Sequence, residues 1–169
     1  MDITQFWAII AAVHSVSGAD LDARVDNLAS RLEELPPVEI ASFETHFNTL
    51  HRQAYRWDLW GAAYVINGGC SDDGFTDFRS WLISEGRKTY EAALQSPDSL
   101  ADLAPIDDAS LEEFAYVASQ VYEHKTGADI FSLDELKSAP PQARSPEGSP
   151  WREEELPRLF PRLWTRYGE

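Results

Sequence analysis

The sequence predicts an all-α fold: a single domain of six or seven helices around a long central helix, with a C-terminal helical strap. Apolar residues recur at intervals of three and four along most of the chain, and no segment shows the alternation typical of a β-strand. Capping residues, prolines and glycines separate these periodic segments. With 169 residues, 12% of them aromatic, the chain is long enough for one packed core and too short for two ordinary domains.

The segments 3–16 and 21–35 carry the pattern of the first two helices. In the first, Phe6, Ile10 and Val13 fall on one face, and in the second, leucine and valine residues recur at intervals of four and three. Two consecutive prolines end the second helix and open the next one, because proline is tolerated in a first turn.

The central helix is predicted from Val38 to Ile66. From Ile40 to Tyr64 apolar residues follow one another at intervals of three and four, which keeps one stripe of the helix facing a partner. Beyond residue 54 two further apolar faces appear, so we expect the second half to be buried on all sides. An Asn-Gly-Gly sequence ends the helix, because glycine readily adopts the left-handed conformation that closes a last turn.

Asp58 and Arg79 are predicted to form an ion pair between two neighbouring helices. Asp58 lies on a face of small residues, where an unpaired charge costs several kcal/mol. Arg79 lies in a helix that begins at residues 71–73 and ends near Gly86, and it has no acidic residue three or four positions away. A short Gly-rich loop joins the two helices and should make them neighbours, with Arg87 as the alternative cation.

Three further segments complete the predicted domain. Residues 87–95 carry one helix, and Pro97 begins a short helical turn. Ser110 and Glu113 form a capping-box pattern in front of another helix, which ends at Gly127.

The chain divides into a helical domain (residues 1–127), a proline-rich linker or strap (128–150) and an amphipathic tail (151–169). The tail has an apolar stripe beside arginines spaced by four residues, whereas the rest of the chain carries essentially the whole net negative charge. Such a tail should dock on the body of its own chain or of a second copy. Pro157 and Pro161 predict that its helix begins late or is kinked.

A formal net charge of −15 limits the classes of partner. Binding to a nucleic-acid backbone requires clustered Lys and Arg and is not expected, whereas a partner protein with a basic surface, or mimicry of nucleic acid, fits the charge. We expect a protein partner, either a second copy or another protein, and no cofactor. The chain has no membrane-length apolar run, no basic signal-peptide region and a single cysteine, so we expect no membrane association and a cytoplasmic location.

Asp72, Asp73 and Asp77 gather at the start of the helix that carries Arg79. They could hold a divalent cation through oxygen ligands, and their spacing resembles, without matching, the aspartate-rich motif of helical prenyl-transferring enzymes. The simpler interpretation is that Asp72 or Asp73 caps the helix while Asp77 complements its dipole.

Cys70 immediately precedes the same helix, whose dipole would lower the pKa of the thiol and favour nucleophilic chemistry. A nucleophilic cysteine also requires a base, and no spacing connects any of the four histidines to Cys70. A small buried thiol in a tight turn is the simpler interpretation.

Six aromatic residues of the central stretch could line a ligand pocket that contains Asp58 and Arg79, although the same residues would equally serve as core. They are Trp57, Trp60, Tyr64, Phe75, Phe78 and Trp81.

The strings GGCSDDGF, DFRSWLISEGR and PDSL, with FWAII near the start, resemble domain-of-unknown-function family 4240, a family of bacterial proteins. The resemblance covers roughly residues 1–125 and leaves out the tail after Gly127. It implies no reaction, ligand or catalytic residue.

Two functional hypotheses remain open. The first is a non-enzymatic interaction or regulatory module that binds another protein. The second is a small-molecule-binding or metal-binding enzyme with Asp58, Asp72, Asp73, Asp77 and Arg79 around a pocket. The first predicts that these groups pair with one another in a domain without a deep cleft, and the second predicts convergent carboxylates that are open to water.

Overall fold

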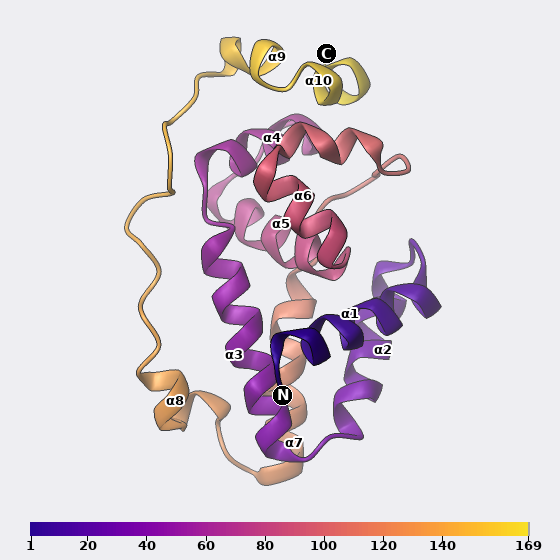
Figure 1. The fold of residues 1–169 in the computed structure, drawn as a ribbon, viewed down its shortest axis with the longest axis vertical. Coiled ribbons are helices and arrows are strands. Elements are labelled where there is room, and N and C mark those ends of the chain that lie inside the picture. Colours follow the sequence, from indigo (N-terminus) through magenta and orange to yellow (C-terminus); the bar gives the residue numbers. More distant parts are fainter. Residues whose placement is uncertain (169) are drawn as a thin grey trace.

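The computed structural model describes residues 1–168, and the predicted all-α, single-domain fold is confirmed (Figure 1). Within these residues no β-strand forms, although one isolated bridge joins Arg56 to Glu147. The elements are α1 (Ile3–Ser17), α2 (Leu21–Glu33), α3 (Pro37–Gln53), α4 (Trp57–Asn67), α5 (Asp72–Ser84), α6 (Arg87–Gln95), the 3-10 helices η1 (Pro97–Asp102) and η2 (Glu112–Tyr116), α7 (Val117–Thr126), η3 (Ile130–Ser132), α8 (Asp134–Lys137), η4 (Glu153–Glu155), α9 (Leu156–Leu159) and α10 (Pro161–Tyr167).

Helices α3 and α7 lie side by side, and the α1–α2 hairpin packs against them, as Figure 1 shows. Side-chain caps fix where the hairpin helices begin, because Asp2 accepts the Gln5 N–H and Asp20 accepts the Ala23 N–H. Helices α4, α5 and α6 gather at the other end of α3. The core runs through all these helices, with Phe6 against Phe43 at a ring separation of 4.7 Å.

The expected continuous helix from Val38 to Ile66 is wrong, because the chain breaks between α3 and α4. Arg56 is extended, with φ −136° and ψ 141°. The linker fills the break: the Glu147 N–H donates to the Tyr55 carbonyl over 2.9 Å, and the Trp57 N–H donates to the Glu147 carbonyl over 2.9 Å. The linker thus satisfies backbone groups that a continuous helix would have paired internally.

The capping box expected at Ser110 does not form. Leu111 is buried in a non-helical conformation, with φ −152° and ψ 72°, and its N–H donates to the Asp77 carbonyl over 3.2 Å. Tertiary burial of Leu111 therefore delays the helix, which begins as η2 and becomes α7 only at Val117.

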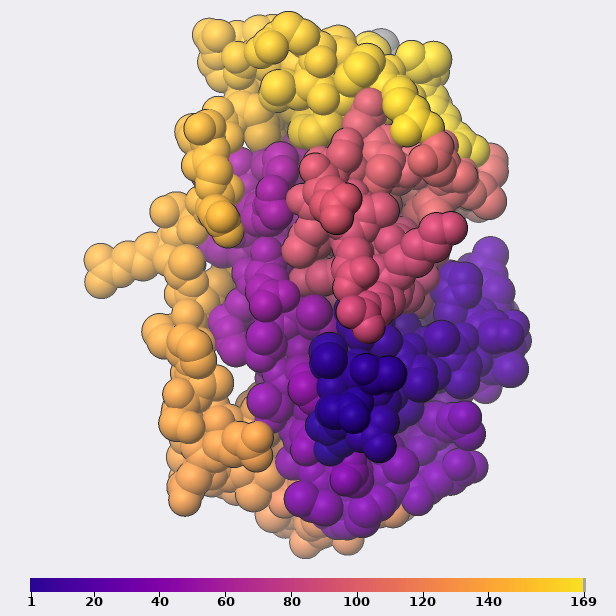
Figure 2. Space-filling model, in the orientation of Figure 1, coloured from indigo at the N-terminus to yellow at the C-terminus, as the bar shows by residue number. Residues whose placement is uncertain are grey.

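The tail docks on its own chain, across α4 and η1. Leu156, Phe160 and Leu163 are buried, and Figure 2 shows the tail in yellow covering one end of the molecule. As predicted, the tail helix is interrupted: α9 ends before Phe160, and α10 restarts with Pro161 in its first turn. No helix among residues 1–168 has both the length and the apolar character needed to cross a membrane.

Candidate functional site

The predicted ion pair between Asp58 and Arg79 is wrong. Asp58 instead pairs with Arg56, the extended residue just before α4, with Nη2 and Oδ2 2.9 Å apart. Arg87 pairs with Glu91 one turn along α6 over 2.7 Å. Both pairs lie at the surface, where such contacts contribute at most about 1 kcal/mol.

Arg79 is 1% exposed and makes no ion pair within residues 1–168. Its guanidinium donates to the carbonyls of His51 and Phe75 and to Thr76 Oγ1, and it lies 4.7 Å from the centre of the Tyr55 ring. Burial lowers the pKa of Arg79 to about 10 and, together with the Arg79 charge, lowers that of His51 to about 4. Arg79 is therefore a buried cation that links α5 to α3 through its hydrogen bonds, and the histidine beside it is neutral.

The aromatic set is stacked rather than arranged around a cavity. Trp57 stacks on Trp60 at 5.2 Å between ring centres, and Trp60 stacks on Phe75 at 5.1 Å. The indole N–H of Trp60 donates to the Cys70 carbonyl over 3.0 Å. Of the six predicted aromatic residues, Trp81 is the one that lines the cleft described below.

Cys70 is half-buried, and burial followed by the charge of Asp77 raises the pKa of its thiol to about 11. The expected lowering by the helix dipole is thus reversed. Ser71 caps α5 by accepting the Gly74 N–H over 3.1 Å, so Asp72 and Asp73 lie in the first turn and do not cap the helix.

An acidic face forms where η2 packs against α5. We define the acidic face as Asp73, Asp77, Asp108, Glu112 and Glu113. Asp77 lies among the other four and feels the charge of each of them. Burial and the four neighbouring carboxylates raise the pKa of Asp77. No member forms an ion pair in the described part of the chain, and among those residues no group of three or more His, Cys, Asp or Glu side chains is arranged to hold a metal ion.

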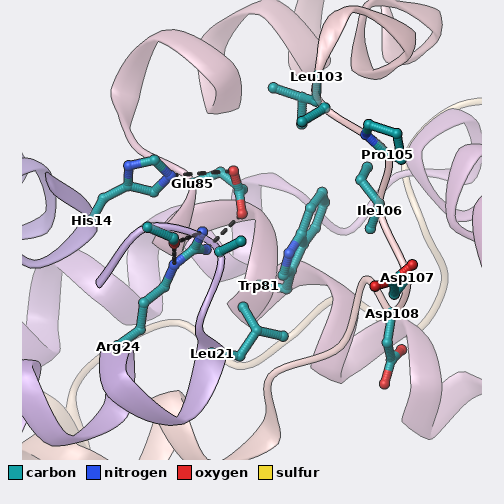
Figure 3. Close-up of a pocket in the computed structure, with 13 residues that line it drawn as sticks. His14, Leu21, Arg24, Trp81, Glu85, Leu103, Pro105, Ile106, Asp107 and Asp108 are labelled. Carbon is teal, nitrogen blue, oxygen red and sulfur yellow. Dashed lines mark hydrogen bonds and ion pairs between the residues drawn. The ribbon is translucent and has the colours of Figure 1, made fainter. Parts of the chain in front are cut away.

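A cleft of about 450 Å³ lies next to the acidic face. The turn between α1 and α2, the C-terminal half of α5 and the segment 103–108 form its walls. Figure 3 shows the Trp81 ring nearly edge-on, with Arg24 and Glu85 on one side and Ile106 on the other.

Arg24 forms the cationic wall of the cleft and is 3% exposed. Its Nε and Nη2 donate to the Gly18 carbonyl, and its Nη1 donates to Ser84 Oγ over 2.9 Å and to Glu85 Oε1 over 2.6 Å. The second Glu85 oxygen lies 3.5 Å from His14 Nε2 (Figure 3). This network fixes the α1–α2 hairpin to the end of α5 and satisfies a buried charge.

The cleft was not predicted from the sequence, although one signal for it is present. Arg24 lies four residues before Leu28, inside the apolar stripe of α2, and a cation in such a stripe requires a buried partner. Nothing local identifies that partner as Glu85, which is 61 residues away.

A family model described as "Protein of unknown function (DUF4240)" matches residues 1–124. The matched region includes the acidic face and the cleft and ends before the tail. No curated protein and no solved structure matches the chain.

Proposed function

The chain belongs to the DUF4240 family, and from that premise we propose that it is a non-enzymatic binding module that recognises a basic segment of another protein. The observation that carries the proposal is the acidic face on α5, η2 and the segment before η2, whose five carboxylates form no ion pair within residues 1–168. A concentration of one charge on a protein surface attracts and orients a partner of opposite charge.

The arginines of the tail support this assignment, because they do not neutralise the acidic face. Arg162 pairs with Asp102 of η1, and Arg166 donates to the carbonyls of Ala101 and Leu103. Arg158 lies 3.8 Å from Glu155 within the tail. These three arginines of the tail are therefore engaged away from the acidic face.

The contacts of the residues first considered for an enzyme site also support a binding module. Asp58 pairs with Arg56, and Arg79 serves as a tie between helices. Asp73 and Asp77 of α5 lie beside Asp108, Glu112 and Glu113 instead. The carboxylates thus lie on a surface suited to a macromolecular partner. A cytosolic location remains part of the proposal.

The proposal can be tested with an unstructured peptide of alternating arginine and glycine, using fluorescence anisotropy at several salt concentrations. We expect Asp77→Asn with Glu113→Gln to weaken binding several-fold and to reduce its salt dependence. The control variant combines Asp134→Asn with Glu135→Gln on α8. This helix follows the end of α7 that is farthest from η2.

Both variants lose two negative charges, so they differ only in where the charges were. Equal weakening by both would mean that the peptide responds to net charge alone and would refute a specific acidic face. Absence of measurable binding by the unmodified protein at low salt would refute the proposed function outright.

A further inference from the structure

We propose that the cleft walled by the α1–α2 turn, α5 and residues 103–108 is a binding site for an organic cation on an apolar stem, supplied by one arginine side chain of the partner. This inference rests on the function proposed above, because it names the anchor point of the basic segment. The acidic face and the cleft share Asp108, so a bound segment can contact both.

The charges at the cleft select a cation. The buried cation, Arg24, already donates to Gly18, Ser84 and Glu85, so an added anion would have to displace bonds that hold the hairpin. Asp107 and Asp108 line the cleft, are exposed and form no ion pair within residues 1–168. The uncompensated charge of the cleft is therefore negative.

The walls suit the apolar stem of such a cation. Leu21, Leu103, Pro105 and Ile106 line the cleft beside the indole of Trp81. Long basic side chains bury their methylene groups along apolar surface while the charged group stays near carboxylates. Trp81 is itself 2% exposed, so its indole forms a packed part of this apolar wall.

The size of the cleft is that of a site for a side chain or a small ligand. Its volume of about 450 Å³ lies within the range of ligand pockets. The Arg24 and Glu85 network gives it one rigid wall, while the segment 103–108 has no regular secondary structure and forms the opposite wall. The site is thus largely formed before a ligand arrives, which lowers the cost of binding.

The first arm of the test uses n-butylguanidinium, which copies the end of an arginine side chain, and n-butylurea, which has similar shape and no charge. Binding is followed by NMR, with the Trp81 indole resonance assigned through Trp81→Phe. We expect n-butylguanidinium to shift that resonance and the amides of residues 103–108, and n-butylurea to shift them at least ten-fold less. Equal shifts with both probes, or shifts centred elsewhere, would overturn the proposal.

The second arm uses variants that leave the buried network intact. Asp107→Asn with Asp108→Asn changes only exposed, unpaired side chains, and the control variant on α8 removes the same charge. We expect the cleft variant to bind n-butylguanidinium at least three-fold more weakly and the control variant to bind it unchanged. No difference between the variants would refute a role for the cleft carboxylates.

The third arm separates a protein partner from a free small cation. In a peptide with a single arginine among glycine, serine and lysine residues, citrulline replaces the arginine and so removes its charge with little change of shape. Weaker binding of the citrulline peptide, with loss of the Trp81 shift, supports the anchor. Equal binding of both peptides at the acidic face overturns the anchor and leaves the proposed function intact. Binding of n-butylguanidinium without either peptide overturns the protein partner and reassigns the cleft to a small organic cation.

Discussion

The hydroxyl oxygen of Tyr167 in α10 accepts a hydrogen bond from the main-chain N–H of Ile106, over 3.1 Å. Arg166, the preceding residue, donates to the carbonyls of Ala101 and Leu103 over 2.5 and 2.6 Å. The tail therefore holds the segment that forms one wall of the cleft, although the tail lies outside the region that matches the family.

We expect Tyr167→Phe to loosen this wall. The substitution leaves the partly buried Ile106 N–H without its acceptor, at a cost of about 1 kcal/mol. Hydrogen exchange should accelerate at the amides of residues 103–108 and stay unchanged in α5. Thr165→Ala is the matched control, since Thr165 bonds within α10 to the Pro161 carbonyl. Similar exchange in the two variants would show that Tyr167 does not hold the wall.

Gly61→Ala should displace the tail from α4. A Cβ at Gly61 would lie 2.6 Å from Cε2 of the buried Phe160 ring and 3.1 Å from the Trp151 indole nitrogen. Overpacking of this kind costs about 1–3 kcal/mol, even though alanine is the better helix former. The expected result is a lower melting temperature with faster hydrogen exchange in residues 156–163. Gly74→Ala, where the nearest atom would lie 3.3 Å away, should cause neither effect.

Glu44 should make the protein less stable as the pH rises. Its side chain is 2% exposed, and burial raises its pKa from 4.5 to about 7 despite the hydrogen bond from Asn48. Between these two values the folded state keeps a proton that the unfolded state has released, so the free energy of unfolding falls with rising pH. The full loss is about 3 kcal/mol and is complete above about pH 7.

Glu44→Gln removes this titration and keeps the side-chain size. Urea unfolding should show a variant close to the unmodified protein at pH 4 and more stable than it at pH 8. Glu123→Gln, an exposed substitution, should leave the difference between pH 4 and pH 8 unchanged. Parallel stability curves for Glu44→Gln and the unmodified protein would contradict the assignment.

Arg79 and Asp58 should differ strongly in their contributions to stability. Asp58 is 39% exposed, so Asp58→Ala should cost about 1 kcal/mol or less. Arg79→Ala removes hydrogen bonds to two carbonyls and leaves a buried space, so it should cost about 3 kcal/mol or more. Urea unfolding of both variants decides the order. Similar losses would mean that Asp58 has a buried partner after all.

Local sequence pattern was sufficient to predict most helices and the interruption of the tail helix. It could not predict the break at Arg56, because apolar spacing continues in phase through the break and Glu147, which fills it, is 91 residues away. The capping pattern at Ser110 failed for a similar reason: Leu111 is fixed by burial against α5. In both places, contacts between distant segments override the local helix preference of the sequence.

The candidate site was harder to predict than the fold. The predicted pair of Asp58 with Arg79 required the charged Asp58 to point inward from an apolar face, whereas Asp58 is 39% exposed. The break before α4 turns Asp58 to the surface and gives it Arg56, two residues away. The network of Arg24 with Glu85 depends on how the α1–α2 hairpin meets α5, which single-sequence periodicity does not specify.

The bridge between Arg56 and Glu147 also sets the local concentration of the tail. Only residues 148–150 separate Glu147 from Trp151, whose indole donates to the Trp57 carbonyl over 2.7 Å. A tether this short holds a bound segment at an effective concentration in about the millimolar range. The tail of a second copy would have to reach comparable concentrations to exchange with it, so dilution should leave each tail on its own α4.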